Sequence, residues 1–278
     1  MKFQSYHFTS VELQNRIRTL LADKSYSKER LKFLLSAIDL TSLEARDTHE
    51  KIKAVCHKAF SFSSIAEGMP NVAAVCFYPP FMATAKQELM DKGIALASVA
   101  GAFPSGQSPL FVKLHEIQYA IDEGAEEIDM VISRGTFLEG KYMEVMDEIQ
   151  AIKIVCGDIH LKVILETGEL QSPENIRKAS ELAILGGGDF LKTSTGKVQP
   201  AATLEAFLIM LDTIKEYYDA TGKMIGIKAA GGISTYESAM DYYWLTKKIL
   251  GDKWLNSSYF RIGASRLADN LVEAILAF

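Results

Sequence analysis

Residues 161–197, LKVILETGELQSPENIRKASELAILGGGDFLKTSTGK, contain the pattern that decides the fold. This stretch begins with a short apolar run, 161–166, and ends with another, 190–194. Between the two runs, Ser172-Pro173 is a typical start of a helix and Gly186 a typical stop. Short apolar segments that alternate with helices are typical of a parallel sheet, so we predict a strand–helix–strand unit here.

The same alternation continues in both directions along the chain. The candidate strands are residues 33–39, 72–78, 94–100, 127–133, 161–166, 190–194, 225–230 and 259–263. Eight such units in 278 residues favour a closed (β/α)8 barrel over an open, doubly wound sheet. No linker, low-complexity tract or repeat divides the chain, so we predict one α/β domain over residues 1–278.

Polar residues mark further helix starts. Residues 9–12, 84–87 and 234–237 have the spacing of a capping box, and Ser108-Pro109 opens a helix that we expect to end at Gly124. The first of these helices precedes the first strand, and its apolar residues are Val11, Leu13, Ile17, Leu20 and Leu21. We therefore predict a helical extension over residues 1–30 and expect its helix to close the bottom of the barrel.

Composition and charge exclude several classes of partner. The chain has 30 Lys and Arg against 35 Asp and Glu, a net charge of −5, which gives no overall field to attract nucleic acid or a membrane surface. No apolar run is long enough for a membrane span, and residues 1–10 do not resemble a signal peptide. Cys56, Cys76 and Cys156 form no C-x-x-C pair. We expect a cytoplasmic protein without disulfides or zinc.

Ionisable residues lie in the middle of four apolar strands: Asp129, Lys162, Lys192 and Lys228. A buried charge must find a partner or change its pKa, and a lysine beside another cation can become a neutral nucleophile near pH 7. A single strand lysine could equally point outward or form a structural ion pair. Three lysines and one aspartate on neighbouring strands favour convergence, and with it Schiff-base chemistry.

Glycines and polar residues follow the last three strands. Thr195, Gly196 and Lys197 follow the sixth, Gly231-Gly232 the seventh, and Gly263, Ser265 and Arg266 lie at the end of the eighth. Barrel enzymes bind phosphate at these carboxyl ends, where backbone N–H groups can approach the anion. A Gly-Gly pair after a strand can also be a simple turn. The positions together predict a phosphate site.

Other conspicuous residues receive a structural interpretation. The histidines lack metal-ligand spacing, so we predict no metal site. Cys76 lies on a strand and is interpreted as a small apolar residue. The cluster Tyr242-Tyr243-Trp244 is expected to pack on the barrel or on a second subunit, and a homodimer is predicted from it.

Eight motifs, in order along the barrel, resemble those of the deoxyribose-phosphate aldolases, which are class I aldolases. They are residues 38–43 (IDLTSL), 75–79 (VCFYP), 101–106 (GAFPSG), 127–132 (EIDMVI), 161–168 (LKVILETG), 190–197 (FLKTSTGK), 228–233 (KAAGGI) and 261–265 (RIGAS). The resemblance implies a TIM barrel that reversibly cleaves 2-deoxy-D-ribose 5-phosphate to D-glyceraldehyde 3-phosphate and acetaldehyde without a cofactor.

The resemblance also implies a role for each strand residue. By motif, Lys192 corresponds to the Schiff-base lysine and Lys228 to the lysine that lowers its pKa. Asp129 corresponds to the aspartate of proton transfer, and Lys162 to an additional lysine of that relay. By the same resemblance, the phosphate of the sugar would rest on Gly196, Lys197, Gly231, Gly232, Gly263 and Ser265. Thr195 and Arg266 are added to this predicted site from their positions after the sixth and eighth strands, and not from the resemblance.

The chain departs from the family pattern near the phosphate site. Many members have arginine where this chain has Ser234, and we expect Arg266 to supply that charge instead. Glu44 replaces an asparagine of some members, and Arg134 follows Ser133. The terminal Phe278, where some relatives have tyrosine, puts a tail-dependent proton step in question. Two alternatives stay open: an aldolase for another phosphorylated sugar, and a non-catalytic sugar-phosphate-binding barrel.

Overall fold

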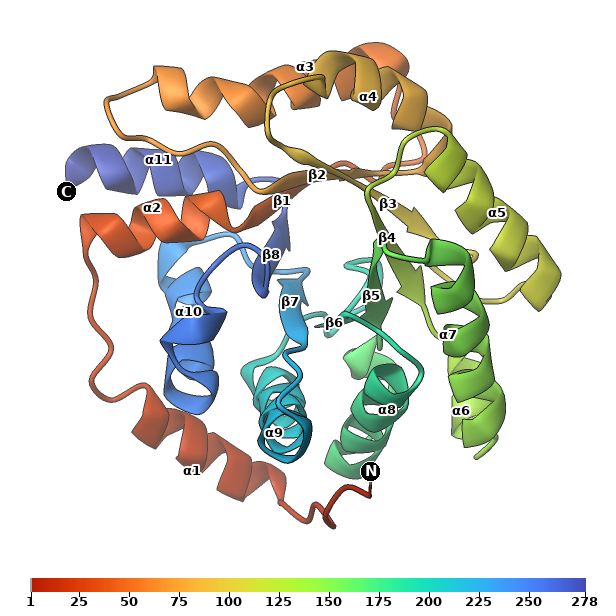
Figure 1. Cartoon of the computed structure of the whole chain (residues 1–278). Coiled ribbons are helices and arrows are strands. Elements are labelled where there is room, and N and C mark those ends of the chain that lie inside the picture. Colours follow the sequence, from red (N-terminus) through yellow and green to blue (C-terminus); the bar gives the residue numbers. More distant parts are fainter. Residues whose placement is uncertain (1) are drawn as a thin grey trace.

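The computed structural model describes residues 2–278 and contains a closed barrel of eight parallel strands in the order β1 to β8 (Figure 1). The strands are β1 Ile38–Thr41, β2 Ala74–Phe77, β3 Ala95–Ala100, β4 Glu127–Val131, β5 His160–Ile164, β6 Phe190–Lys192, β7 Gly226–Ala230 and β8 Phe260–Ala264. Each strand pairs with the next in sequence, and β8 pairs with β1. The predicted (β/α)8 barrel, a TIM barrel, is confirmed.

Helices surround the barrel on its outer side (Figure 1). They are α1 Ser10–Leu20, α2 Lys28–Ser36, α3 His49–Ser61, α4 Met82–Leu89, α5 Leu110–Asp122, α6 Arg134–Leu138, α7 Tyr142–Cys156, α8 Pro173–Leu185, α9 Leu204–Thr221, α10 Tyr236–Leu250 and α11 Leu267–Ala277. Short 3-10 turns complete the set: η1 Phe62–Ser64, η2 Pro79–Phe81, η3 Thr167–Glu169 and η4 Asp252–Trp254. The main apolar core lies between these helices and the strands.

The strand register brings the charged strand residues together inside the barrel. Asp129 is the register partner of Lys162, Lys192 that of Lys228, and Lys228 that of Arg261. Register partners in a sheet point to the same face. A second, smaller apolar cluster, separate from the main core, contains Leu43, Cys76, Ala97, Val99, Phe103, Val131 and Ile164. Ile164 therefore shares the inner face with Lys162, two residues earlier on β5.

The predicted first strand is wrong in its first half. Residues 28–36 form α2, and β1 is limited to Ile38–Thr41. The buried residues Leu31, Leu34 and Leu35 have helical spacing, and the hydroxyl of Ser27 accepts a hydrogen bond from the N–H of Arg30. A short apolar run at the end of a helix has the same length and composition as a buried strand, so the two are easily confused in a sequence.

Three of the predicted helix starts also need adjustment, whereas two are confirmed. Thr84 does not cap α4, which begins at Met82 directly after the 3-10 turn η2. Thr235, one residue after the predicted Ser234, caps α10, and Pro109 itself precedes the first residue of α5. The capping box of Thr9 and Glu12 and the cap of Ser172 on α8 are confirmed.

The N-terminal helix α1 does not close the bottom of the barrel. It lies outside the helical ring, against α9 and α10 (Figure 1). Leu13 and Ile17 are buried there, whereas Val11 is 66% exposed. Contact with two outer helices buries only a narrow stripe of α1, so the first turn of the helix remains in solvent.

The aromatic cluster on α10 is buried within the chain rather than on a free surface. Tyr242 packs edge-on against Phe207 of α9, and the indole N–H of Trp244 donates to the carbonyl of Ser25. This cluster therefore offers no surface to a second subunit. The homodimer stays a prediction, and the cluster does not support it.

Among residues 2–278, no helix is both long and apolar enough to cross a lipid bilayer.

Candidate active site

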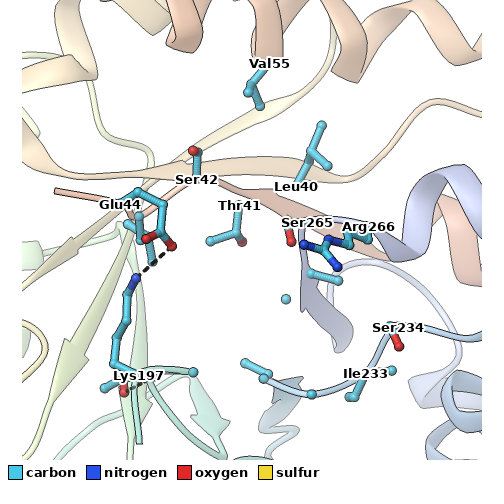
Figure 2. Close-up of a pocket in the computed structure, with 18 of the residues that line it drawn as sticks. Leu40, Thr41, Ser42, Glu44, Val55, Lys197, Ile233, Ser234, Ser265 and Arg266 are labelled. Atoms are coloured by element: carbon cyan, nitrogen blue, oxygen red, sulfur yellow. Dashed lines mark hydrogen bonds and ion pairs between the residues drawn. The ribbon is translucent and has the colours of Figure 1, made fainter. Parts of the chain in front are cut away.

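A cavity of about 650 Å³ opens where the last strands of the barrel end (Figure 2). It is bordered by β1 and its following loop, and by the loops after β6, β7 and β8. All eight residues predicted to hold the phosphate line it: Thr195, Gly196, Lys197, Gly231, Gly232, Gly263, Ser265 and Arg266. The position at the carboxyl ends of the strands is the one where barrel enzymes keep their active sites.

Below this cavity, the four charged strand residues meet around one carboxylate. Oδ2 of Asp129 lies 2.7 Å from Nζ of Lys192 and 2.7 Å from Nζ of Lys228. Its second oxygen, Oδ1, accepts a hydrogen bond of 2.9 Å from Lys162. Asp129 and Lys228 are fully buried, as is Lys162, and Lys192 is 3% exposed. The predicted convergence of these side chains is therefore present in the structure.

Three further charged residues, which the sequence reasoning did not select, complete the network. Asp39 of β1 accepts hydrogen bonds from Lys228 and, at 2.6 Å, from Arg261 of β8. Glu127 of β4 accepts from Lys162 at 2.5 Å and from Arg261 at 2.9 Å. All three are ionisable residues within apolar strands, so the signal that identified the other four also applied to them.

The charges of this network balance only if one amine is neutral. It contains three carboxylates, which are Asp39, Glu127 and Asp129, and four basic groups, which are Lys162, Lys192, Lys228 and Arg261. A net charge in a buried site is costly, which favours the loss of one proton. Lys192 is the natural donor of that proton because it has one carboxylate partner, whereas Lys162 and Lys228 each contact more than one.

The pKa directions agree with this count. Burial lowers the pKa of Lys192, and the nearby Lys228 cation lowers it further, so that Asp129 does not restore the ordinary value. Burial also disfavours the charge on Lys228, but Asp129 and Asp39 outweigh burial and raise its pKa. Two lysines side by side thus have opposite shifts: Lys228 stays a cation, and Lys192 more readily becomes a free amine.

Lys192 also differs from its neighbours in its access to the cavity. It lines the cavity, and the other lysines of the network, Lys162 and Lys228, do not. Asp129 likewise lies beneath the cavity surface. A small molecule in the cavity could therefore reach one amine of the network directly, and this amine is the one whose pKa is lowered. This arrangement can form an imine with a carbonyl compound.

The loops after β6 and β7 form one end of the cavity and pack against each other through glycine. Gly231 has a φ of +89°, and a Cβ atom there would lie 2.6 Å from Cβ of Ala201 and 3.0 Å from Cα of Gly196. Only glycine combines this backbone conformation with so close an approach. The two loops thus bring main-chain groups of Gly196 and Gly231 side by side at the cavity wall.

Two cations face this end of the cavity from opposite sides (Figure 2). Nζ of Lys197 lies 3.0 Å from Oε1 of Glu44, which follows β1, so this ion pair joins the loops after β1 and β6 along one side of the cavity. Arg266, at the end of β8, is exposed and lines the other side. Glu44 was noted as a departure in the sequence, but its pairing with a residue 153 positions away was not foreseen.

Cys76 does face the barrel interior, with Sγ 4.0 Å from Oδ2 of Asp129. It is fully buried and does not line the cavity. Burial raises the pKa of its thiol to about 11, so the sulfur remains a protonated, apolar neighbour of the network. Within residues 2–278, no group of three or more His, Cys, Asp or Glu side chains is arranged to hold a metal ion.

Comparisons with known proteins agree with this site. Residues 33–242 match the model of the DeoC/LacD family aldolases. The chain is 39% identical over 274 residues to the deoxyribose-phosphate aldolase of Homo sapiens, covering 94% of this chain and 86% of that protein. A tetrameric deoxyribose phosphate aldolase from Aeropyrum pernix superposes with a TM-score of 0.70 at 25% identity, covering 95% of this chain and 98% of that one.

The family match covers more than half of the chain and includes β1 to β7. Among these strands, β4 to β7 carry Asp129, Lys162, Lys192 and Lys228. The human relative extends the likeness to nearly the whole length. On the strength of these two matches, the chain belongs to the DeoC/LacD family of aldolases.

Proposed function

We propose that this chain is a class I aldolase, a carbon–carbon lyase that reversibly cleaves 2-deoxy-D-ribose 5-phosphate to D-glyceraldehyde 3-phosphate and acetaldehyde. The observation that carries the proposal is the state of Lys192, whose pKa is lowered and which alone among the network lysines lines the cavity. The name of the human relative, deoxyribose-phosphate aldolase, supports this substrate. A place in the breakdown of deoxynucleosides in the cytoplasm is part of the proposal.

The reaction begins when the neutral amine of Lys192 attacks C1 of the open-chain sugar to give a carbinolamine. The carbinolamine hydroxyl takes up a proton from water and leaves as water, which gives an iminium ion. Asp129, acting through a water molecule, accepts the proton of the C3 hydroxyl. The C2–C3 bond then breaks, its electron pair moves toward the iminium nitrogen, and glyceraldehyde 3-phosphate leaves. The remaining enamine takes a proton at C2, and hydrolysis returns acetaldehyde and free Lys192.

Each neighbour of Lys192 has a distinct part in this proposal. Lys228, held as a cation by Asp39 and Asp129, keeps the pKa of Lys192 low. Lys162 contacts the other oxygen of Asp129 and completes the proton relay. The electron sink is the iminium ion itself, so no cofactor and no metal ion is needed.

The phosphate end of the cavity orients the substrate. Lys197 and Arg266 supply positive charge, and Gly196, Gly231, Gly232 and Gly263 leave the main chain accessible. Holding the phosphate there brings C1 of the sugar toward Lys192 and lowers the entropic barrier of the first step.

The test is a coupled assay of purified protein with 2-deoxy-D-ribose 5-phosphate. The glyceraldehyde 3-phosphate formed is isomerised to dihydroxyacetone phosphate, which an NADH-dependent dehydrogenase then reduces. Activity that persists in EDTA and disappears in Lys192→Ala supports the proposal. Cleavage of a different phosphorylated sugar at a higher kcat/KM would mean that this sugar is the substrate instead. Phosphate binding without any cleavage would contradict the enzymatic assignment.

A further inference from the structure

Glu166 lies fully buried between β5 and the loop that carries Lys197, and its carboxylate forms hydrogen bonds with Thr195 and Arg134 and not with Lys192. Its carboxylate Oε2 accepts a hydrogen bond from the hydroxyl of Thr195 at 2.5 Å. The N–H of Thr195 lies 3.2 Å from Oε1. Both oxygens of one buried carboxylate are therefore used to hold Thr195, the first residue of the predicted phosphate loop.

The backbone of Glu166 is itself unusual. Its φ is +54° and its ψ is +59°, in the left-handed region. A residue with a side chain as large as glutamate rarely occupies this region, and such residues persist where the surroundings hold them in place. The carboxylate of this residue bonds to Thr195, in the loop after β6.

Arg134 fixes the carboxylate from the other side. Its Nη1 lies 3.2 Å from Oε2 of Glu166 and 3.2 Å from the carbonyl oxygen of Pro104. Nη2 donates to the carbonyl of Ser105 at 3.0 Å, and Nε pairs with Glu169 at 2.7 Å. One guanidinium thus ties together the loops after β3, β4 and β5, and Glu166 extends the connection to the loop after β6.

Thr195 connects the carboxylate of Glu166 to the main chain of Lys197. Because its hydroxyl donates to Glu166, the lone pairs of Oγ1 are free to accept, and the N–H of Lys197 lies 3.0 Å from that atom. Thr195, Gly196 and Lys197 all line the cavity. The orientation of the cavity wall at Lys197 therefore depends on a carboxylate that does not itself line the cavity.

We propose that Glu166 is a positioning residue for the phosphate of the substrate: its carboxylate, braced by Arg134, holds Thr195–Lys197 in the conformation that binds the anion. This inference rests on the proposed function, because it assigns the phosphate to that loop. Glu166 acts on affinity for the phosphate and not on imine formation at Lys192.

The test compares Glu166→Gln with Glu169→Gln. Both substitutions remove a carboxylate that pairs with Arg134, but Glu169 makes no contact with Thr195 and is exposed at its side chain. In Glu166→Gln the KM for 2-deoxy-D-ribose 5-phosphate should rise about 10-fold, the loss expected for one charge-assisted hydrogen bond. The kcat/KM for unphosphorylated 2-deoxyribose should stay at the wild-type value. Glu169→Gln should match the wild type with both substrates.

Thr195 provides a second pair of variants in case Glu166→Gln does not fold. Thr195→Val removes the hydroxyl but keeps the shape of the side chain, and Thr195→Ser keeps the hydroxyl. We expect the valine variant to lose phosphate selectivity as Glu166→Gln does, and the serine variant to retain it. An unchanged preference for the phosphorylated sugar in Glu166→Gln or Thr195→Val would overturn the inference, as would an equal loss in Glu169→Gln.

A calorimetric titration with inorganic phosphate distinguishes a failure of this inference from a failure of the proposed function. A wild-type chain that binds phosphate but does not cleave the sugar contradicts the aldolase proposal alone. A Glu166→Gln chain that binds phosphate as tightly as the wild type contradicts the positioning role alone. A wild-type chain that binds neither phosphate nor the sugar contradicts both.

Discussion

Lys192 and Lys228 donate hydrogen bonds to the same atom, Oδ2 of Asp129, each at 2.7 Å. They are register partners on β6 and β7, yet their pKa values move in opposite directions. The difference has a physical cause in their partners: Lys228 also pairs with Asp39, whereas Lys192 faces the cavity and has Asp129 alone. Lys228 is therefore a permanent cation, and Lys192 is the nucleophile of the pair.

Removal of the permanent cation should move the pH dependence of the reaction. In Lys228→Met, Lys192 loses the neighbouring positive charge that lowers its pKa, so its pKa rises and the neutral amine forms at higher pH. The fraction of Lys192 that is neutral at pH 7 therefore falls in this variant, and kcat/KM at pH 7 falls with it. The acid limb of kcat/KM against pH should shift to higher pH.

Lys228→Arg is the control for this experiment because it keeps the charge next to Lys192. Asp39 retains Arg261 in either variant, and Asp129 retains Lys162, so neither carboxylate is left unpaired. An acid limb that stays in the same place in Lys228→Met would contradict the electrostatic role of Lys228.

Arg266 is expected to carry part of the affinity for the phosphate. In Arg266→Ala the KM for 2-deoxy-D-ribose 5-phosphate should rise roughly 10- to 100-fold, as for the loss of one hydrogen bond to a charged group. The KM for 2-deoxyribose should not change. The double variant Arg266→Ala/Ser234→Arg should recover affinity, because Ser234 lines the same cavity. An unchanged KM for the phosphorylated sugar in Arg266→Ala would remove Arg266 from the phosphate site.

Glu44 competes with the substrate for Lys197. Their ion pair lies along one side of the cavity (Figure 2). The two atoms are 3.0 Å apart, and the Glu44 side chain is 58% exposed. In Glu44→Gln the KM for the phosphorylated sugar should fall about two- to fivefold, in line with the small strength of exposed ion pairs. Glu50→Gln, which disrupts the exposed pair with Lys53 on α3, is the control. A higher KM in Glu44→Gln would mean that Glu44 assists binding.

Acid should destabilise the fold through the buried network. Burial raises the pKa values of Asp39, Glu127 and Asp129, but the surrounding cations outweigh burial and lower all three. These carboxyls bind protons more weakly in the folded chain than in the unfolded chain. Their stabilising contribution is therefore complete above the ordinary carboxyl pKa, about pH 4, and is lost as the pH falls below it.

Urea unfolding at a series of pH values measures this contribution. The free energy of unfolding should decrease from pH 5 toward pH 3 by at least about 1.4 kcal/mol, the equivalent of one pKa unit. A free energy of unfolding that is constant over this interval would show that the network does not hold its carboxylates ionised.

Much of the fold was predictable because strand-forming runs and helix boundaries follow local chemistry. All eight strands were expected at positions that overlap the observed ones, and the cap at Ser172 and the stop at Gly186 were correct. The error at residues 33–36 has a simple cause. The helical spacing of the apolar residues is visible only when the residues before position 33 are included, and without them the short apolar run resembles a strand. The position of α1 depends on tertiary contacts with α9 and α10, which no local pattern encodes.

The site was predictable to the extent that buried charges are rare in strands. This signal identifies Asp129, Lys162, Lys192 and Lys228. It applies equally to Asp39, Glu127 and Arg261, which the sequence prediction does not include. The contact of Glu166 with Thr195 was not predictable, because it depends on a left-handed backbone and on residues 29 positions apart. The same holds for Glu44 and Lys197, which meet only when the barrel closes.

The central claim is that Lys192 is the nucleophile, and the most direct measurement is chemical trapping. The protein is incubated with acetaldehyde, reduced with sodium borohydride, digested, and analysed by peptide mass spectrometry beside Lys192→Ala. Our account predicts an ethyl group on Lys192 and on no other lysine of the network, with no modified network peptide in the variant. Modification of Lys228 or Lys162 in place of Lys192, or no modification of the network at all, would contradict it.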